Sequence, residues 1–160
     1  MTPELIQAPE LEVQKWLNTD EDLSLEKLRG KVVAIFAFQM LCPGCVENSI
    51  PQARNVHAMF SDADFAVLGL HTVFEHHDAM TEVSLKAFMH EYRIEFPVGI
   101  DMPSGDPKDP LPKTMRRYQT GGTPSLILID RQGRLRKNKM GHEHDLMLGA
   151  ELMALMREDS

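Results

Sequence analysis

Phe38-Gln39-Met40-Leu41-Cys42-Pro43-Gly44-Cys45 contains the only two cysteines of this 160-residue chain. An apolar run, residues 32–38, leads into the stretch, and a helical pattern of residues follows it. Two thiols three positions apart at the start of a helix can close a disulfide without moving the backbone. A helix N-terminus favours negative charge, so it stabilises a thiolate on Cys42, which is the form that attacks disulfides. The stretch therefore predicts a redox-active dithiol, with two merely adjacent buried cysteines or half of a metal site as the alternatives.

The composition is that of one globular domain, residues 1–160. A chain of this length can bury a core, and 42% of its residues are hydrophobic. The formal net charge of −7 argues against nucleic acid and anionic membranes as partners. The first residues show no basic region followed by an apolar core, and no run approaches the roughly 18 apolar residues of a membrane span. We therefore expect a cytoplasmic protein that holds its cysteine pair mostly reduced.

The hydrophobic pattern predicts strands that alternate with helices. The expected strands are 32–38, 64–71, 96–101, 125–130 and 134–140, and the expected helices or helical turns are 25–29, 46–60, 81–93, 113–118 and 144–157. Residues 32–38 show no polar alternation, so they predict a central strand that is buried on both faces. Pro51 removes a backbone donor, so we expect a kink in the helix after the cysteines. The N-terminal residues predict no element, only a packing role for Trp16. The pattern indicates an α/β fold with a mixed sheet.

Three pieces of the sequence resemble the thioredoxin-like superfamily, and most closely its TlpA-like and redoxin branch of thiol-disulfide oxidoreductases. The first is the strand followed by Cys42, Cys45 and a helix with Pro51. The second is Gly122-Thr123-Pro124 before an apolar strand, which is similar to the cis-proline loop of these proteins. The third, residues 128–135, is similar to the hairpin that follows that loop.

The resemblance covers residues 24–157 and implies a thioredoxin-like fold, in which a central mixed β-sheet is flanked by helices. Residues 96–101 are similar to part of a helix–strand unit that this branch inserts into the fold. The residues before position 24 would form an N-terminal extension. The expected architecture is thus one thioredoxin-like domain with an insertion and an extension.

The sequence departs from the family pattern at two places. Leu41 stands where an aromatic residue, usually Trp, commonly precedes the first cysteine. Pro51 follows Cys45 by six residues, where TlpA-like proteins usually show five. This shift leaves open whether Glu47 or Asn48 takes the place of the acidic residue that the branch often carries after its second cysteine. A solvated helix residue is the simpler interpretation of Glu47.

The resemblance also implies a role for each residue near the dithiol. Cys42 would attack the substrate disulfide, Cys45 would resolve the mixed disulfide, and the Thr123 backbone would hold the partner's chain. The residues expected to contact substrate are Leu41, Pro43, Gly44, Gly122 and Thr123, with Pro124 beside the sulfurs. A proline in such a bend reaches the cis form at a cost of only about 0.5–1 kcal/mol, so we expect a cis Thr123–Pro124 bond.

No cofactor is implied beyond the redox-active disulfide, and no metal. The implied partners are a protein disulfide substrate and an upstream dithiol or disulfide redox partner. Reduction of the substrate is the expected direction in the cytoplasm.

Three other functions stay open. Peroxiredoxin-type peroxidases resemble this fold, but Ile35 and Gln39 occupy the proline and threonine positions of their Pro-x-x-x-Thr-x-x-Cys motif. A copper- or zinc-binding protein could combine two soft thiolates with histidines. The candidate histidines are His71, His76, His77, His142 and His144. A non-catalytic interaction module would keep the fold with an unreactive dithiol.

The expected hairpin also carries a basic cluster on an acidic protein. Its members are Arg131, Arg134, Arg136, Lys137 and Lys139. We expect a solvated face there, with the docking of an acidic partner as the alternative.

Overall fold

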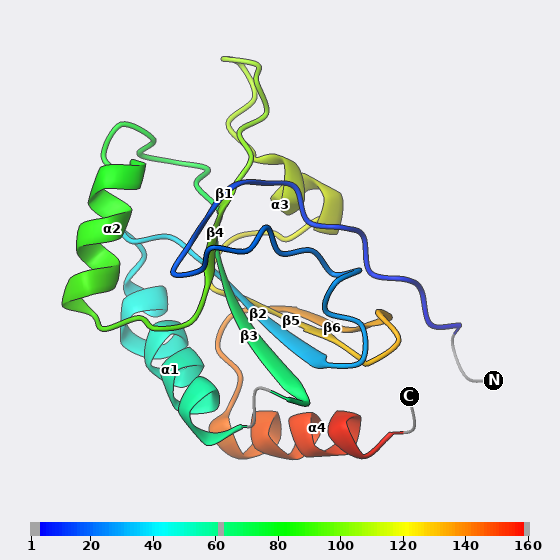
Figure 1. The fold of residues 1–160 in the computed structure, drawn as a ribbon. Helices are drawn as coiled ribbons and strands as arrows, with labels where there is room; N and C mark the ends of the chain where they lie inside the picture. Colours follow the sequence, from blue (N-terminus) through cyan, green and yellow to red (C-terminus); the bar gives the residue numbers. More distant parts are fainter. Residues whose placement is uncertain (1–3, 61–62, 159–160) are drawn as a thin grey trace.

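The sheet of this protein has six strands, in the order β1-β4-β3-β2-β5-β6 (Figure 1). The computed structural model describes residues 4–60 and 63–158. Its strands are β1 Val13–Leu17, β2 Val32–Phe38, β3 Phe65–His71, β4 Val98–Asp101, β5 Ser125–Ile129 and β6 Leu135–Met140. Its helices are a π-helical turn Cys45–Ser49, α1 Ile50–Met59, α2 Glu82–Glu91, α3 Lys113–Tyr118 and α4 Asp145–Arg157.

The sheet is mixed, as the sequence predicts. β2 pairs in parallel with β3, and β3 pairs in parallel with β4. β5 lies antiparallel to β2 on its other side, and β1 and β6 close the two edges as antiparallel strands. Each expected strand is present within a few residues of its predicted bounds. β2 therefore occupies the interior of the sheet and carries the dithiol at its carboxyl end.

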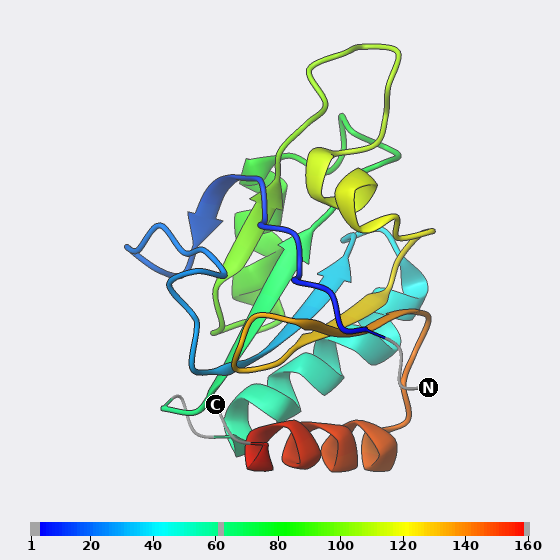
Figure 2. The same ribbon diagram turned by 90° about the vertical axis from the view of Figure 1, so that its right-hand side faces the viewer.

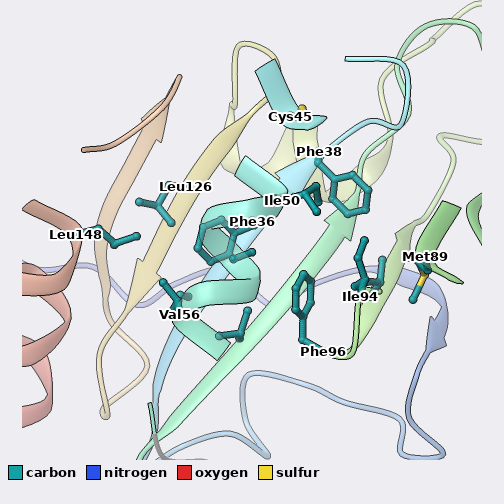
Figure 3. Close-up of a cluster of buried hydrophobic side chains, with 14 of the residues drawn as sticks. Phe36, Phe38, Cys45, Ile50, Val56, Met89, Ile94, Phe96, Leu126 and Leu148 are labelled. Atoms are coloured by element: carbon teal, nitrogen blue, oxygen red, sulfur yellow. The ribbon is translucent and has the colours of Figure 1, made fainter. Parts of the chain in front are cut away.

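β2 is buried along its whole length, which confirms the prediction from its unbroken apolar run. Side chains of a strand alternate between its faces. Val32, Ala34, Phe36 and Phe38 contribute to one hydrophobic cluster with α1, α2 and α4. Figure 3 shows Phe36 packed between α1 and the sheet, with Cys45 at one end of this cluster. The intervening residues of β2 contribute to a second cluster, which α3 and the N-terminal segment cover (Figure 2).

β1 was not identified from the sequence. Of its five residues only Leu17 is fully buried, and two of the others are exposed. An edge strand with so little burial lacks the clear period of two that marks an interior strand. Trp16 is partly buried against the second cluster, in agreement with the packing role expected for it.

Pro51 marks a change of helix type. The Ile50 N–H donates to the Cys45 carbonyl, five residues back, and this bond defines the π-helical turn. α1 then begins at Ile50 with Pro51 in its first turn, directly after the π-helical turn, so no Pro51 N–H is present to bond a carbonyl of that preceding turn. The helical segment thus changes from π-helix to α-helix just before Pro51. The wider turn holds Cys45 at the buried side of the helix start.

The basic cluster is paired with carboxylates, so the prediction of a simply solvated face was wrong. Arg134 and Arg136 both bind Asp130, and Lys137 binds Glu143 and Glu151 on and before α4. The side chains of Asp130 and Glu143 are almost fully buried by these contacts. The cluster therefore fastens the hairpin to α4, and it offers little free positive charge for an acidic partner.

Helix α2 begins as its sequence indicates. The Thr81 side chain accepts the Ser84 N–H, and the Ser84 side chain accepts the Thr81 N–H, which forms a reciprocal cap.

At the hairpin turn, Gly133 has φ of 79°, which favours glycine. Within residues 4–60 and 63–158, no helix is both long and apolar enough to cross a lipid bilayer.

Candidate functional site

The two cysteines meet where β2 ends and the helical segment begins. Cys42 is half-buried and Cys45 is fully buried. Both are free thiols, and their sulfur atoms lie 2.6 Å apart. A disulfide has an S–S distance of about 2.05 Å, so closing the bond needs only a small movement. The structure therefore places the two thiols so that one can be reached from outside and the other can react with it.

The surroundings of the two sulfurs differ. The Cys45 N–H donates to the Cys42 sulfur at 3.3 Å, which places a helix-start donor where negative charge would develop. The Cys42 sulfur also lies 3.6 Å from the Thr123 carbonyl oxygen, to which its thiol donates. Burial, followed by the hydrogen bond with Cys42, raises the pKa of the Cys45 thiol to about 12. Cys45 is thus protonated at neutral pH before Cys42 has reacted.

The Thr123–Pro124 peptide bond is cis, as the sequence predicts. The Pro124 ring lies against Gly44, because a Cβ atom added at Gly44 would be 3.4 Å from Pro124 Cδ. The loop is therefore in contact with the dithiol motif, and the Thr123 carbonyl faces the Cys42 sulfur. Two segments 80 residues apart in sequence build one site, as the resemblance implied.

Two exposed apolar side chains lie next to the segments that build the site. Leu41 is 55% exposed, and Met140, at the end of β6, is 60% exposed. The Met140 sulfur lies 3.3 Å from the position of a Cβ atom at Gly121 and 3.4 Å from one at Gly122. Side chains at these two glycines would crowd Met140. Met140 could not be assigned to this place from the sequence, because its position depends on the pairing of Met140 with Ser125 across β5 and β6.

Glu47 lies outside this constellation. Its side chain is exposed on the π-helical turn, and no hydrogen bond or ion pair joins it to another described residue. Asn48 is likewise exposed. Neither residue is placed as the proton acceptor that the family pattern left open.

His71 is a residue of the site that the sequence presented only as a candidate metal ligand. It ends β3, is 1% exposed, and packs against Phe38 with the ring centroids 5.1 Å apart. Its Nε2 atom accepts the Met40 N–H at 3.3 Å. Burial lowers the pKa of His71 to about 4, so the ring is neutral and can serve as an acceptor. His71 thereby anchors the loop that leads from β2 to Cys42.

Two of the other candidate histidines, His77 and His144, make hydrogen bonds to the backbone. His77 Nε2 bonds the Pro110 carbonyl, and the His144 side chain accepts the Leu146 N–H at the start of α4. Among the residues that the structure describes, no group of three or more His, Cys, Asp or Glu side chains could hold a metal ion. The dithiol therefore has no third donor beside it in this part of the chain.

The neutral state of His71 makes stability depend on pH. In the unfolded chain a histidine has a pKa of about 6.5, so between pH 6.5 and 4 the unfolded state binds more protons than the folded state. The contribution of His71 to stability is then fully present above pH 6.5 and decreases by about 3 kcal/mol as the pH drops through this window. His71→Gln can still accept the Met40 N–H but does not titrate. Urea unfolding from pH 7 to pH 4.5 should show a smaller decline for the variant, and parallel curves would contradict this role of burial.

Known proteins share this architecture. The chain matches the family model for the AhpC/TSA family over residues 6–138. A solved structure of a thioredoxin-like superfamily protein is 56% identical, with a TM-score of 0.93 over 96% of this chain and 98% of that chain. A thiol-disulfide isomerase from Corynebacterium glutamicum is 49% identical, with a TM-score of 0.89 over 95% of this chain and 98% of that one.

Curated relatives are more distant. Protein DipZ of Mycobacterium bovis is 28% identical over 137 residues, which are 84% of this chain and 18% of DipZ. Thiol-disulfide oxidoreductase ResA of Bacillus cereus is 25% identical over 122 residues, which are 76% of this chain and 61% of ResA. The chain thus spans less than two thirds of these two relatives. With the fold, the dithiol and the cis-proline loop in place, the chain belongs to the AhpC/TSA family and is a redoxin-type protein with a thioredoxin-like fold.

Proposed function

We propose that this protein is a thiol-disulfide oxidoreductase whose Cys42–Cys45 pair reduces, or exchanges, disulfides in a protein partner. The observation that carries the proposal is the asymmetric dithiol. One sulfur is accessible beside the cis-proline loop, and the second lies 2.6 Å behind it, buried and protonated. The names of the Corynebacterium and Bacillus relatives support the same chemistry.

The reaction has two steps. The Cys42 thiolate attacks a substrate disulfide, a Cys42–substrate bond forms, and the first substrate sulfur leaves and takes up a proton. The Cys45 sulfur then attacks the Cys42 sulfur, the Cys42–Cys45 bond forms, and the second substrate sulfur leaves with the proton that Cys45 gives up. Two electrons pass from the dithiol to the substrate. An upstream dithiol partner must then reduce the Cys42–Cys45 disulfide again. We propose that this cycle takes place in the cytoplasm.

The exposed apolar side chains beside the site suit a polypeptide substrate. An extended chain laid along residues 122–124 could bond to their backbone, as in strand addition, while Leu41 and Met140 contact its apolar side chains. A cavity of about 630 Å³ lies between the loops of residues 72–80 and 102–112, and His71 lines it but neither cysteine does. We therefore propose that the dithiol reacts with a chain laid across it and not with an enclosed small molecule.

A comparison of two oxidants tests the proposal against the peroxidase alternative. Ile35 and Gln39 stand at the proline and threonine positions of the peroxidase motif, and neither has the ring or the hydroxyl of those residues. The reduced protein should be oxidised readily by insulin, a general protein disulfide. Hydrogen peroxide should oxidise it at a rate close to that of an ordinary thiol, as followed by alkylation of the remaining thiols at timed intervals. Fast reaction with peroxide and none with insulin would contradict the proposal.

A further inference from the structure

A buried amide lies directly behind the dithiol. Gln39 follows β2 and is 1% exposed. Its Oε1 atom accepts the Phe74 N–H at 3.1 Å. Its Nε2 atom lies 3.4 Å from Glu75 Oε1 and 3.4 Å from Thr123 Oγ1. The amide therefore joins the loop after β3 to the cis-proline loop, immediately before the cysteines.

The partners of Gln39 fix which way its amide points. A backbone N–H can only donate, so the amide oxygen must face Phe74. An ionised carboxylate can only accept, so the amide nitrogen must face Glu75. With both ends assigned, the NH2 group is also the group that faces Thr123. A flipped amide would leave the Phe74 donor unpaired and set the oxygen against a carboxylate.

This orientation decides what the Thr123 hydroxyl can do. A hydroxyl has one proton to donate, and here it receives a hydrogen bond from Gln39. Its own proton is therefore free for another acceptor. Hydrogen bonds from the Gln39 backbone and the Thr123 side chain to Cys45 lower the pKa of that thiol, against the larger effect of its burial. Thr123 also lies at the dithiol, because its carbonyl oxygen is 3.6 Å from the Cys42 sulfur and the two sulfurs are 2.6 Å apart. The Cys45 sulfur is therefore a candidate acceptor for the Thr123 proton.

We propose that Gln39 is a positioning residue for the resolving step: its amide directs the Thr123 hydroxyl proton toward the Cys45 sulfur as that sulfur attacks the mixed disulfide. The inference rests on the proposed thiol-disulfide function and names the groups that serve its second half. Glu75 and the Phe74 N–H hold the amide in the required orientation.

The resolving step balances without a further reactant. The Cys45 sulfur forms a bond to the Cys42 sulfur, and the bond from Cys42 to the substrate sulfur breaks. The electron pair of that bond leaves with the substrate sulfur, which takes the proton lost by Cys45. The Thr123 hydroxyl keeps its proton and stabilises the negative charge on Cys45 through a charge-assisted hydrogen bond.

A small aromatic disulfide, dithiobis-nitrobenzoate, separates the two halves of the reaction. The attack by Cys42 releases one coloured thiolate, and the attack by Cys45 then releases a second. Gln39→Met keeps the chain length but removes the donor. It should slow the second release by about tenfold, because a Thr123 hydroxyl that Gln39 no longer orients loses its hydrogen bond to the charged sulfur, and it should change the first release by less than about twofold.

Glu47→Gln is the matched control, because it changes a side chain of similar size near the dithiol that has no contact with the site. Both of its release rates should equal those of the wild type. Thr123→Val should reproduce the slow second release, and Thr123→Ser, which restores a hydroxyl, should recover most of the rate. The double variant with Gln39→Met should be no slower than Thr123→Val alone, because the two residues act through one hydrogen bond.

The inference is overturned if Gln39→Met leaves the second release unchanged, slows both releases equally, or adds its full effect to that of Thr123→Val. If Gln39→Met does not fold, as judged by circular dichroism, the comparison of Thr123→Val with Thr123→Ser decides, and equal second rates overturn the inference. A wild-type protein that releases only one thiolate would instead contradict the proposed function itself.

Discussion

Cys42→Ser will reduce the rate of protein disulfide reduction to the uncatalysed background. The attacking species in such reactions is a thiolate, and a serine hydroxyl does not ionise near neutral pH and does not form a bond to a disulfide sulfur. Every other contact of the site can survive the substitution, because the oxygen is smaller than the sulfur and the donor from the Cys45 backbone stays in place. The loss should therefore be complete while the fold is retained.

Cys45 cannot take over the attack in this variant. It is fully buried, and burial raises the pKa of its thiol to about 12, so almost none of it is thiolate at neutral pH. The measurement is insulin reduction driven by dithiothreitol, with circular dichroism and thermal unfolding as controls for folding. Substantial turnover by Cys42→Ser would show that a different nucleophile performs the reaction.

Cys45→Ser will stop the reaction after its first half and trap the substrate. Cys42 keeps its exposure and its backbone donor, so it should still attack a disulfide and form the mixed disulfide. The sulfur that lies 2.6 Å away in the wild type is then missing, and no other described cysteine can break the bond. About one substrate should accumulate on each chain, and multiple turnover should cease.

Intact-protein mass spectrometry under non-reducing conditions measures this accumulation directly. Dithiothreitol should remove the adduct, which distinguishes a mixed disulfide from other modifications. Turnover of insulin by Cys45→Ser at the wild-type rate would refute the assignment of Cys45 as the resolving thiol.

The features that the sequence predicts well are those set by local pattern. The apolar run of residues 32–38 specifies a strand buried on both faces, and the three-residue spacing specifies neighbouring thiols at a helix start. The Gly122-Thr123-Pro124 bend adds the second half of the site through its resemblance to a known loop. None of these depends on the details of strand register.

The residues that sequence reasoning missed are those whose roles arise from tertiary pairing. His71 is the register partner of Phe38 across β2 and β3, and that pairing brings its ring to the Met40 N–H. In the sequence Gln39 is only a polar residue after an apolar strand, and its hydrogen bonds with Phe74 and Thr123 become visible in the structure. The basic cluster reads as a solvated face until α4 supplies its carboxylates. The only sign of the role of Gln39 in the sequence is that an amide side chain follows directly after an apolar strand and precedes the dithiol.

The central claim is that Cys42 and Cys45 form a reversible intramolecular disulfide, and alkylation of the oxidised protein tests it most directly. The protein is treated with oxidised glutathione, unfolded in denaturant, alkylated with iodoacetamide and weighed by mass spectrometry. We predict no alkyl groups after oxidation and two after reduction with dithiothreitol, with both states obtained repeatedly from one sample. Two alkyl groups after the oxidant, or linked chains in place of an intramolecular bond, would contradict the account.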